Sequence, residues 1–226
     1  MIGVKVKFVI IGVHERDNII KEMQKTLFNK AEVFYDPIKN KNCLARTLKV
    51  LNEEDVHKYT HIAVLCDDLE LCIDFDKIVA IMCKMHPDAI FSPYNSRLHF
   101  SDRLYNSPYV KNKGCGCYGQ CIIIPVKYIK LFNDWVKQRC PKDYPHDDVA
   151  VGEFAKDNKI EVFCTIPSIL QHIEPCNSIL KYNNKNKISK VYIDKVAPLM
   201  EDWYSTTYSC VNIGNSKCMV DELIKK

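Results

Sequence analysis

Apolar residues along this chain form two alternating kinds of pattern up to residue 180. Continuous runs of mostly β-branched and aromatic residues are typical of strands covered on both faces. Between these runs, apolar residues recur at helical spacing and predict amphipathic helices. We expect strands at 4–13, 31–36, 60–68, 88–94, 119–125 and 159–167. We expect helices at 17–29, 43–53, 74–85, 125–138 and 146–158.

The order strand, helix, strand, helix, strand at the start of the chain predicts an α/β fold. The expected architecture is a single Rossmann-like domain with a mixed, mostly parallel central sheet flanked by helices. Ligands of such sheets bind outside the carboxyl ends of the strands. Polar residues follow the first three strands, at 14–16, 35–36 and 67–68. We therefore expect these three groups to converge at one edge of the sheet.

Length and composition are those of an ordinary globular domain. The 226 residues suffice for one sizeable domain, and the apolar (47%) and charged (27%) fractions argue against global disorder. No stretch approaches the roughly 18 apolar residues of a membrane span, so we expect none. We also expect no secretory leader, because the first apolar run is too short for one. The twelve cysteines lack zinc-site spacing, which favours free thiols in a cytoplasm (the host cytoplasm if the protein is viral).

The positive charge is unevenly distributed along the chain. The formal net charge is only +4, yet residues 97–142 contain many lysines and arginines and few acids. A second basic patch lies at 181–190. Such patches are either solvated surfaces or binding surfaces for a polyanion, and the sequence leaves both interpretations open.

Three groups of residues could carry chemistry. Asp67 and Asp68 end a buried strand, where adjacent carboxylates either bind a divalent cation or are simply solvated. Asp147 and Asp148 begin a helix, where one acid could serve as a cap and two exceed what a cap needs. His172 lies among apolar residues, either as a core histidine or as a ligand to a metal already bound by carboxylates.

The order and spacing of these motifs resemble the GT-A class of nucleotide-sugar glycosyltransferases. "VLCDDLEL" looks like the metal-binding D-x-D motif in its adjacent-carboxylate variant, with Cys66 where a strict motif has its first Asp. "DDVAVG" is similar to the "EDV-x-x-G" of many inverting members. "PSILQH" resembles the "PS-x-x-Q-H" of several families, including the branching N-acetylglucosaminyltransferases. The likeness spans residues 4–180, which gives a GT-A-like catalytic domain at 1–180 and a C-terminal extension at 181–226 that packs on it.

The resemblance implies a hexosyltransferase that moves a sugar from a UDP-sugar to an acceptor hydroxyl, with inversion and with Mn²⁺ or Mg²⁺. Asp68 would hold the ion, supported by Asp67 and His172, and the ion would neutralise the departing diphosphate. Asp148 would be the catalytic base, with Asp147 beside it.

The resemblance and the topology also suggest contacts to the donor. Arg16 and Asp36 are candidates for the nucleotide and its ribose. Gly116 and Tyr118 belong to the glycine-rich "GCGCYG" and would lie near the donor sugar or the acceptor, where Tyr118 could stack on a ring.

Two acceptors suit this chemistry. The basic stretch at 97–142 favours DNA, as in bacteriophage enzymes of DNA modification that glucosylate hydroxymethylated bases, which would have to be flipped out of the duplex. The alternative is a glycan or lipopolysaccharide. More remote alternatives are a nucleotidyltransferase, which would need a more glycine-rich first loop than "GVHERDN", and an inactive sugar-nucleotide-binding module.

Overall fold

The computed structural model describes residues 3–36, 42–94, 109–111, 117, 119–165 and 168–173. Among the sequence predictions, Gly116, Tyr118 and the extension at 181–226 lie outside these residues, as does most of the 95–113 segment.

The helices and longer strands predicted from periodicity are present, each shorter than its sequence pattern by a few residues. The strands are β1 (Val6–Gly12), β2 (Ala31–Tyr35), β3 (His61–Cys66), β4 (Leu69–Leu71), β5 (Ile90–Ser92), β6 (Tyr109–Lys111), β7 (Cys121–Pro125), β8 (Val162–Thr165) and β9 (Leu170–His172). The α-helices are α1 (Asp17–Thr26), α2 (Cys43–Leu51), α3 (Phe75–Met85), α4 (Ile129–Arg139) and α5 (Asp147–Asp157). Short 3-10 helices η1 (His14–Arg16), η2 (Val56–Lys58) and η4 (Val126–Tyr128) precede α1, β3 and α4.

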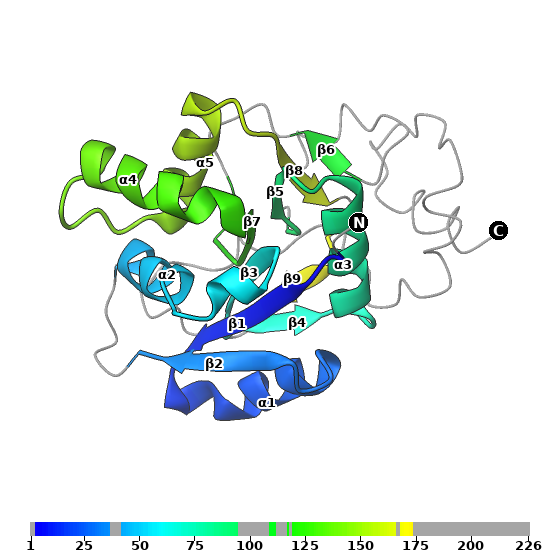
Figure 1. Cartoon of the computed structure of the whole chain (residues 1–226). Helices are drawn as coiled ribbons and strands as arrows, with labels where there is room; N and C mark the ends of the chain where they lie inside the picture. Colours follow the sequence, from blue (N-terminus) through cyan, green and yellow to red (C-terminus); the bar gives the residue numbers. More distant parts are fainter. Residues whose placement is uncertain are drawn as a thin grey trace, which may run out of the picture.

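Seven strands form the central sheet in the order β2-β1-β3-β7-β5-β8-β6 (Figure 1). The pairs β1–β2, β1–β3 and β5–β8 are parallel, whereas β7 and β6 run antiparallel to their neighbours. Five of the seven strands therefore point the same way. The prediction of an α/β fold with a mixed, mostly parallel sheet flanked by helices is confirmed.

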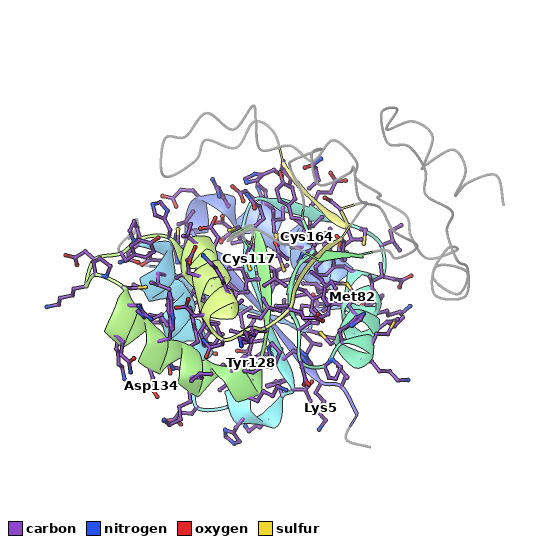
Figure 2. The ribbon with its side chains drawn as sticks, turned by 90° about the horizontal axis from the view of Figure 1, so that it is seen from above. Lys5, Met82, Cys117, Tyr128, Asp134 and Cys164 are labelled. Carbon is purple, nitrogen blue, oxygen red and sulfur yellow. The ribbon has the colours of Figure 1, made fainter. Side chains whose placement is uncertain are left out.

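Both faces of the sheet are covered, because successive side chains of a strand point to opposite faces. Phe8 and Ile10 of β1 pack in a core with α1 and α3, whereas Val9 packs in a second core with α2, α4 and α5. Figure 2 shows Met82 on the inner side of α3 and Asp134 on the outer side of α4. This double coverage explains why the strands are continuous apolar runs. Among the described helices, none is long and apolar enough to cross a membrane.

A second, two-stranded sheet pairs β4 with β9, and its register aligns Leu69 with His172. The sequence analysis assigned neither strand, because three residues are too few to show an alternating pattern. This small sheet brings the late "PSILQH" segment beside the residues that follow β3. It is the feature that places His172 at the carboxyl edge of the central sheet.

Candidate functional site

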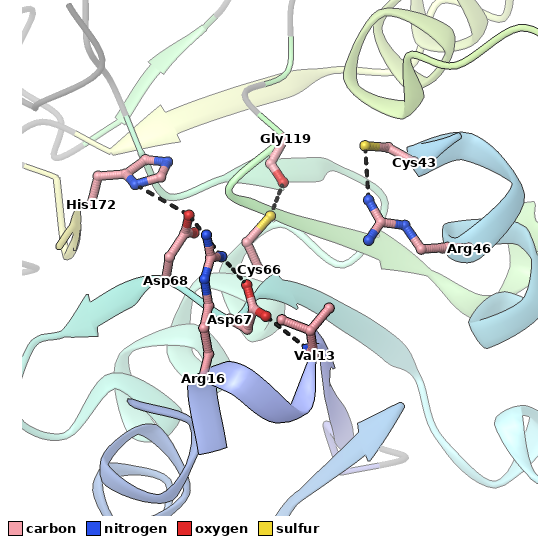
Figure 3. Close-up of polar contacts among 9 residues, drawn as sticks. All are labelled: Val13, Arg16, Cys43, Arg46, Cys66, Asp67, Asp68, Gly119 and His172. Carbon is pink, nitrogen blue, oxygen red and sulfur yellow. Dashed lines mark hydrogen bonds and ion pairs between the residues drawn. The ribbon is translucent and has the colours of Figure 1, made fainter. Parts of the chain in front are cut away.

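Residues after the first three strands converge, as the sequence predicted. The backbone N–H of Asp36 donates to the carbonyl of Gly12 (3.1 Å), which joins the ends of β1 and β2. The backbone N–H of Val13 donates to Oδ2 of Asp67 (2.9 Å), which joins the ends of β1 and β3 (Figure 3). The guanidinium of Arg16 contacts the acids after β3.

Gly12 permits this convergence. A Cβ at this position would lie 2.6 Å from Cδ1 of Ile20 and 3.2 Å from Cβ of Asp67. The first distance is shorter than real carbon contacts, so the end of the flexible Ile20 side chain would have to move, and the second would require Asp67 to shift by a few tenths of an ångström. Gly12 therefore favours close packing between the first strand and the acidic pair.

Arg16 explains how two adjacent carboxylates are tolerated at a buried strand end. Its Nη1 contacts Oδ1 of Asp67 and lies 3.1 Å from Oδ2 of Asp68. All three side chains are largely buried. Burial raises the pKa of Asp67 above its usual value, while Arg16 and the N–H of Val13 oppose that rise by stabilising the charged form. The guanidinium thus offsets the repulsion between the two acids.

His172 lies on the other side of Asp68 from the first strand. Its Nδ1 is 3.6 Å from Oδ2 of Asp68, and the backbone N–H of Ile173 donates to the carbonyl of Asp68 (3.0 Å). Asp68 therefore lies between Arg16 and His172, which come from opposite ends of the described chain (Figure 3).

The donor atoms at this edge fit a hard divalent cation that completes its shell with other ligands. Asp68 offers a carboxylate oxygen and His172 an imidazole nitrogen, while Asp67 is engaged by Val13 and Arg16. Within the described ranges, no group of three or more His, Cys, Asp or Glu side chains is arranged to hold a metal. Mg²⁺ and similar ions are commonly bound through one or two carboxylates plus substrate phosphates and water. Such an ion would therefore depend on its substrate for most of its ligands.

Cys66, which stands in place of the first Asp of a strict D-x-D motif, is a neutral thiol. Its Sγ donates to the carbonyl of Gly119 (3.2 Å). Burial raises its pKa well above the usual value, and the negative charges of Asp68, Asp147 and Asp67 add to the rise. Cys66 therefore lies between the two acidic pairs and does not act there as a carboxylate would.

Asp147 is the inner member of the second acidic pair, at the start of α5. Its Oδ2 accepts a hydrogen bond from Oγ1 of Thr47 (2.7 Å), and its Oδ1 accepts one from the backbone N–H of Asp148 (2.9 Å). Burial raises the pKa of Asp147 to about 6, and the charge of Asp148 adds to this, whereas the Thr47 bond opposes it. A Cβ on Gly119 would lie 3.4 Å from Oδ1 of Asp147, so the two acidic pairs approach one another through Gly119 and Cys66.

Asp148 is the member of that pair with spare hydrogen-bonding capacity. Its Oδ1 accepts from the backbone N–H of Val149 (2.8 Å). Its Oδ2 has no hydrogen-bond donor among the residues that the structure describes, and the side chain is partly exposed. A carboxylate with one available oxygen can accept a proton from an incoming hydroxyl.

Asp36 lies at the same edge of the sheet and faces α2. Its Oδ2 is 3.9 Å from Nε of Arg46, whose Nη2 donates to Sγ of Cys43 (3.1 Å; Figure 3). The sequence analysis missed Arg46 and Thr47 as members of the site. Their signal was weak: polar residues on an amphipathic helix are normally solvent-facing, and only the helix packing shows that these two face acids.

The described part of the basic 97–142 stretch is largely ion-paired. On and before α4, Lys127 pairs with Asp88, Lys130 with Asp134 at 3.0 Å, and Arg139 with Asp157 at 3.9 Å. These pairs are exposed, so each one contributes little to stability. They give this face a mixed charge rather than a continuous positive one.

A cavity of about 420 Å³ lies away from Arg16, His172 and the two acidic pairs. It is formed by the end of α3, the segment before β5, the start of α4 and the turn before β8. These segments meet at the amino ends of β5 and β8, the opposite edge of the sheet. The cavity contains none of the residues predicted to bind a ligand.

Comparisons with known proteins leave the family open. No protein-family model matches the sequence, and no curated protein matches it. The solved structure of A197 from STIV matches with a TM-score of 0.40 at 13% identity, covering 74% of this chain and 85% of that one. A glycosyltransferase involved in the glycosylation of the major capsid of PBCV-1 also matches with a TM-score of 0.40, at 9% identity, covering 93% of this chain and 98% of that one. Likenesses this weak assign neither a family nor an activity.

Proposed function

We propose that this protein is a metal-dependent, inverting glycosyltransferase that moves a sugar from a UDP-sugar to an acceptor hydroxyl. The observation that carries the proposal is the grouping of Asp68, Arg16 and His172 at the carboxyl edge of the sheet. This grouping lies next to a second acidic pair across Cys66 and Gly119. Ligands of open α/β sheets bind at this edge, and the sequence motifs of the same residues resemble those of the GT-A class.

In this proposal the donor diphosphate lies beside Asp68 and Arg16. A Mn²⁺ or Mg²⁺ held by Asp68 and His172 supplies Lewis-acid neutralisation of the leaving diphosphate when it is bound. Arg16 offers a planar guanidinium that suits phosphate oxygens. Asp36, at the end of β2, is the candidate contact to the ribose.

Asp148 is the proposed base. It takes the proton of the acceptor hydroxyl as that oxygen bonds to C1 of the sugar. The bond from C1 to the phosphate oxygen breaks, and UDP leaves with the electron pair. Asp147 is the positioning residue, because its two hydrogen bonds connect the start of α5 to Thr47 of α2.

A hydroxymethylated base in DNA is the proposed acceptor, with a glycan or lipopolysaccharide as the alternative. Because Lys127, Lys130 and Arg139 are paired with acids, a DNA surface depends on the other basic residues of the stretch. These are Arg97, Arg103, Lys111 and Lys113, with Lys137 and Lys142. The proposed location is a cytoplasm, that of the host if the protein is viral.

The test measures UDP release from a panel of UDP-sugars with Mn²⁺, with and without hydroxymethylated DNA or glycan acceptors. We expect Asp148→Asn to bind UDP normally and to lose about 10²- to 10⁴-fold in transfer, the usual contribution of a general base. Asp143→Asn, which alters an exposed acid just before α5, is the matched control and should keep full activity. Transfer by Asp148→Asn at the control rate would place the base elsewhere. Release of pyrophosphate from a nucleoside triphosphate, without UDP release, would identify a nucleotidyltransferase instead.

A further inference from the structure

The side chain of Arg16 lies at the place where the metal ion and the donor diphosphate would bind. It is the last residue of η1, at the junction with α1, and its side chain crosses to the acids after β3. One carboxylate oxygen, Oδ2 of Asp68, lies 3.1 Å from Nη1 of Arg16 and 3.6 Å from Nδ1 of His172. The guanidinium and the imidazole therefore approach the same oxygen.

A divalent ion on that oxygen would lie close to the guanidinium of Arg16 as it now lies. Bonds from such an ion to carboxylate oxygens are about 2.0–2.2 Å long, so an ion on Asp68 beside His172 would be in close contact with the guanidinium. The two cations repel one another strongly in a largely buried site. Binding of the ion thus favours departure of the Arg16 guanidinium from Asp68.

We propose that Arg16 is an exchangeable counter-cation that couples metal binding to donor binding. In the free protein it neutralises Asp67 and Asp68. When the ion and a nucleoside diphosphate bind together, the ion replaces Arg16 on Asp68, and the guanidinium moves to the diphosphate oxygens. This role rests on the proposed function: Arg16 is the residue that makes ion binding and donor binding cooperative.

The arrangement of the neighbouring groups permits the exchange. Asp67 keeps a hydrogen bond from the N–H of Val13, so one of the two acids stays anchored when the guanidinium moves. Arg16 has a long, flexible side chain and lies in a short 3-10 turn rather than inside a helix. A diphosphate accepts bidentate hydrogen bonds from a guanidinium, which replace those lost to the carboxylates.

The consequence is reciprocal cooperativity. Arg16 opposes the ion when no phosphate is present, because it occupies the same oxygen. A diphosphate draws Arg16 away and so strengthens ion binding, and by linkage the ion strengthens diphosphate binding by the same factor. Ligation of the ion by phosphate adds to this coupling, so loss of Arg16 reduces the coupling without removing it.

The experiment measures free Mn²⁺ by electron paramagnetic resonance during titration of the whole chain, with and without UDP. In the wild-type protein we expect UDP to tighten Mn²⁺ binding at least 10-fold, within the usual range of coupling. Arg16→Gln should bind Mn²⁺ alone at least 3-fold more tightly than the wild type, and its enhancement by UDP should be at least 5-fold smaller. Arg139→Gln removes an arginine from an exposed ion pair on α4 and should behave as the wild type.

A second variant separates charge from shape and covers the case in which Arg16→Gln does not fold. Arg16→Lys keeps the cation, so Mn²⁺ alone should bind as weakly as in the wild type, whereas UDP enhancement should fall because an ammonium lacks the bidentate fork. If Arg16→Gln binds Mn²⁺ alone no more tightly than the wild type, the role of Arg16 is only to support Asp67 structurally, and the proposal is overturned. The proposal is also overturned if the Mn²⁺ affinity of the wild-type protein does not change when UDP is present.

The two proposals can fail separately. If the wild type releases UDP from a sugar donor with Mn²⁺ but Arg16→Gln leaves Mn²⁺ affinity unchanged, only the coupling role of Arg16 is wrong. If the wild type binds neither UDP nor Mn²⁺, the glycosyltransferase proposal is wrong and the coupling role falls with it.

Discussion

Replacing Asp147 by asparagine should stabilise the protein at neutral and alkaline pH. Asp147 is partly buried, and burial raises its pKa to about 6 from the usual 3.8. Asparagine has nearly the same shape as a protonated aspartate. It can accept from the N–H of Asp148 and donate to the hydroxyl of Thr47, which can both donate and accept. The substitution therefore removes a buried charge while keeping both hydrogen-bonded neighbours.

The size of the effect follows from the pKa of Asp147. A rise of about 2 units corresponds to about 3 kcal/mol of stability at most, at 1.36 kcal/mol per unit. Partial exposure of the side chain lets water screen the charge, so about 1–2 kcal/mol is the expected gain. Because the folded-state pKa is raised, the contribution of Asp147 to stability is full below about pH 4. It is lost as the pH rises through about 6.

The assay is urea unfolding of Asp147→Asn and the wild type between pH 4 and pH 8. The difference in unfolding free energy should be near zero at pH 4, should grow through pH 6 and should level off by pH 8. Asp143→Asn, at an exposed position, should stay within about 0.5 kcal/mol of the wild type throughout. A difference that is flat with pH, or a variant less stable than the wild type at pH 8, would refute this explanation of the raised pKa.

The remaining predictions concern the packing of the first strand. Gly12→Ala should lower the free energy of unfolding by about 1–3 kcal/mol, because the new methyl group clashes with Cδ1 of Ile20 and crowds Cβ of Asp67, whereas Gly3→Ala, with no atom within 4 Å of its Cβ, should change it little. Equal stability of the two alanine variants in urea would contradict the close approach at Gly12. Lys7→Met should destabilise by about 1–3 kcal/mol at pH 7, because the buried ammonium of Lys7 pairs with three carboxylates of Glu32, Glu53 and Asp55. The loss should shrink only in strongly acidic solution, because the hydrogen bond from Lys7 lowers the pKa of Asp55, and a loss that does not depend on pH would exclude the ion pairs as its cause.

The helices and the longer strands could be predicted because their signal is local. The run from His61 to Cys66 is buried on both faces, so its composition alone indicates a central strand. Convergence of Asp36 with the acids after β3 followed from a general property of parallel sheets. The antiparallel direction of β7 could not be derived from its apolar run, because composition does not specify direction.

The motif resemblance led us to expect Asp68 beside His172, but the contacts that produce the site depend on long-range packing, which local sequence patterns do not specify. The pairing of β4 with β9 involves three residues from each strand, and only this pairing brings His172 to Asp68. The contact of Arg16 with both carboxylates requires β1 and β3 to be neighbours in a specific register. Thr47 of α2 reaches Asp147 of α5 through helix packing alone.

Crystals soaked with UDP and Mn²⁺, examined by anomalous scattering at the manganese edge, test the central claim most directly. The account predicts one strong anomalous peak within bonding distance of Asp68 and His172, with diphosphate oxygens on the ion and the guanidinium of Arg16 turned toward them. A manganese peak or a UDP molecule bound away from the carboxyl edge of β1 and β3, for instance in the cavity at the opposite edge, would contradict it.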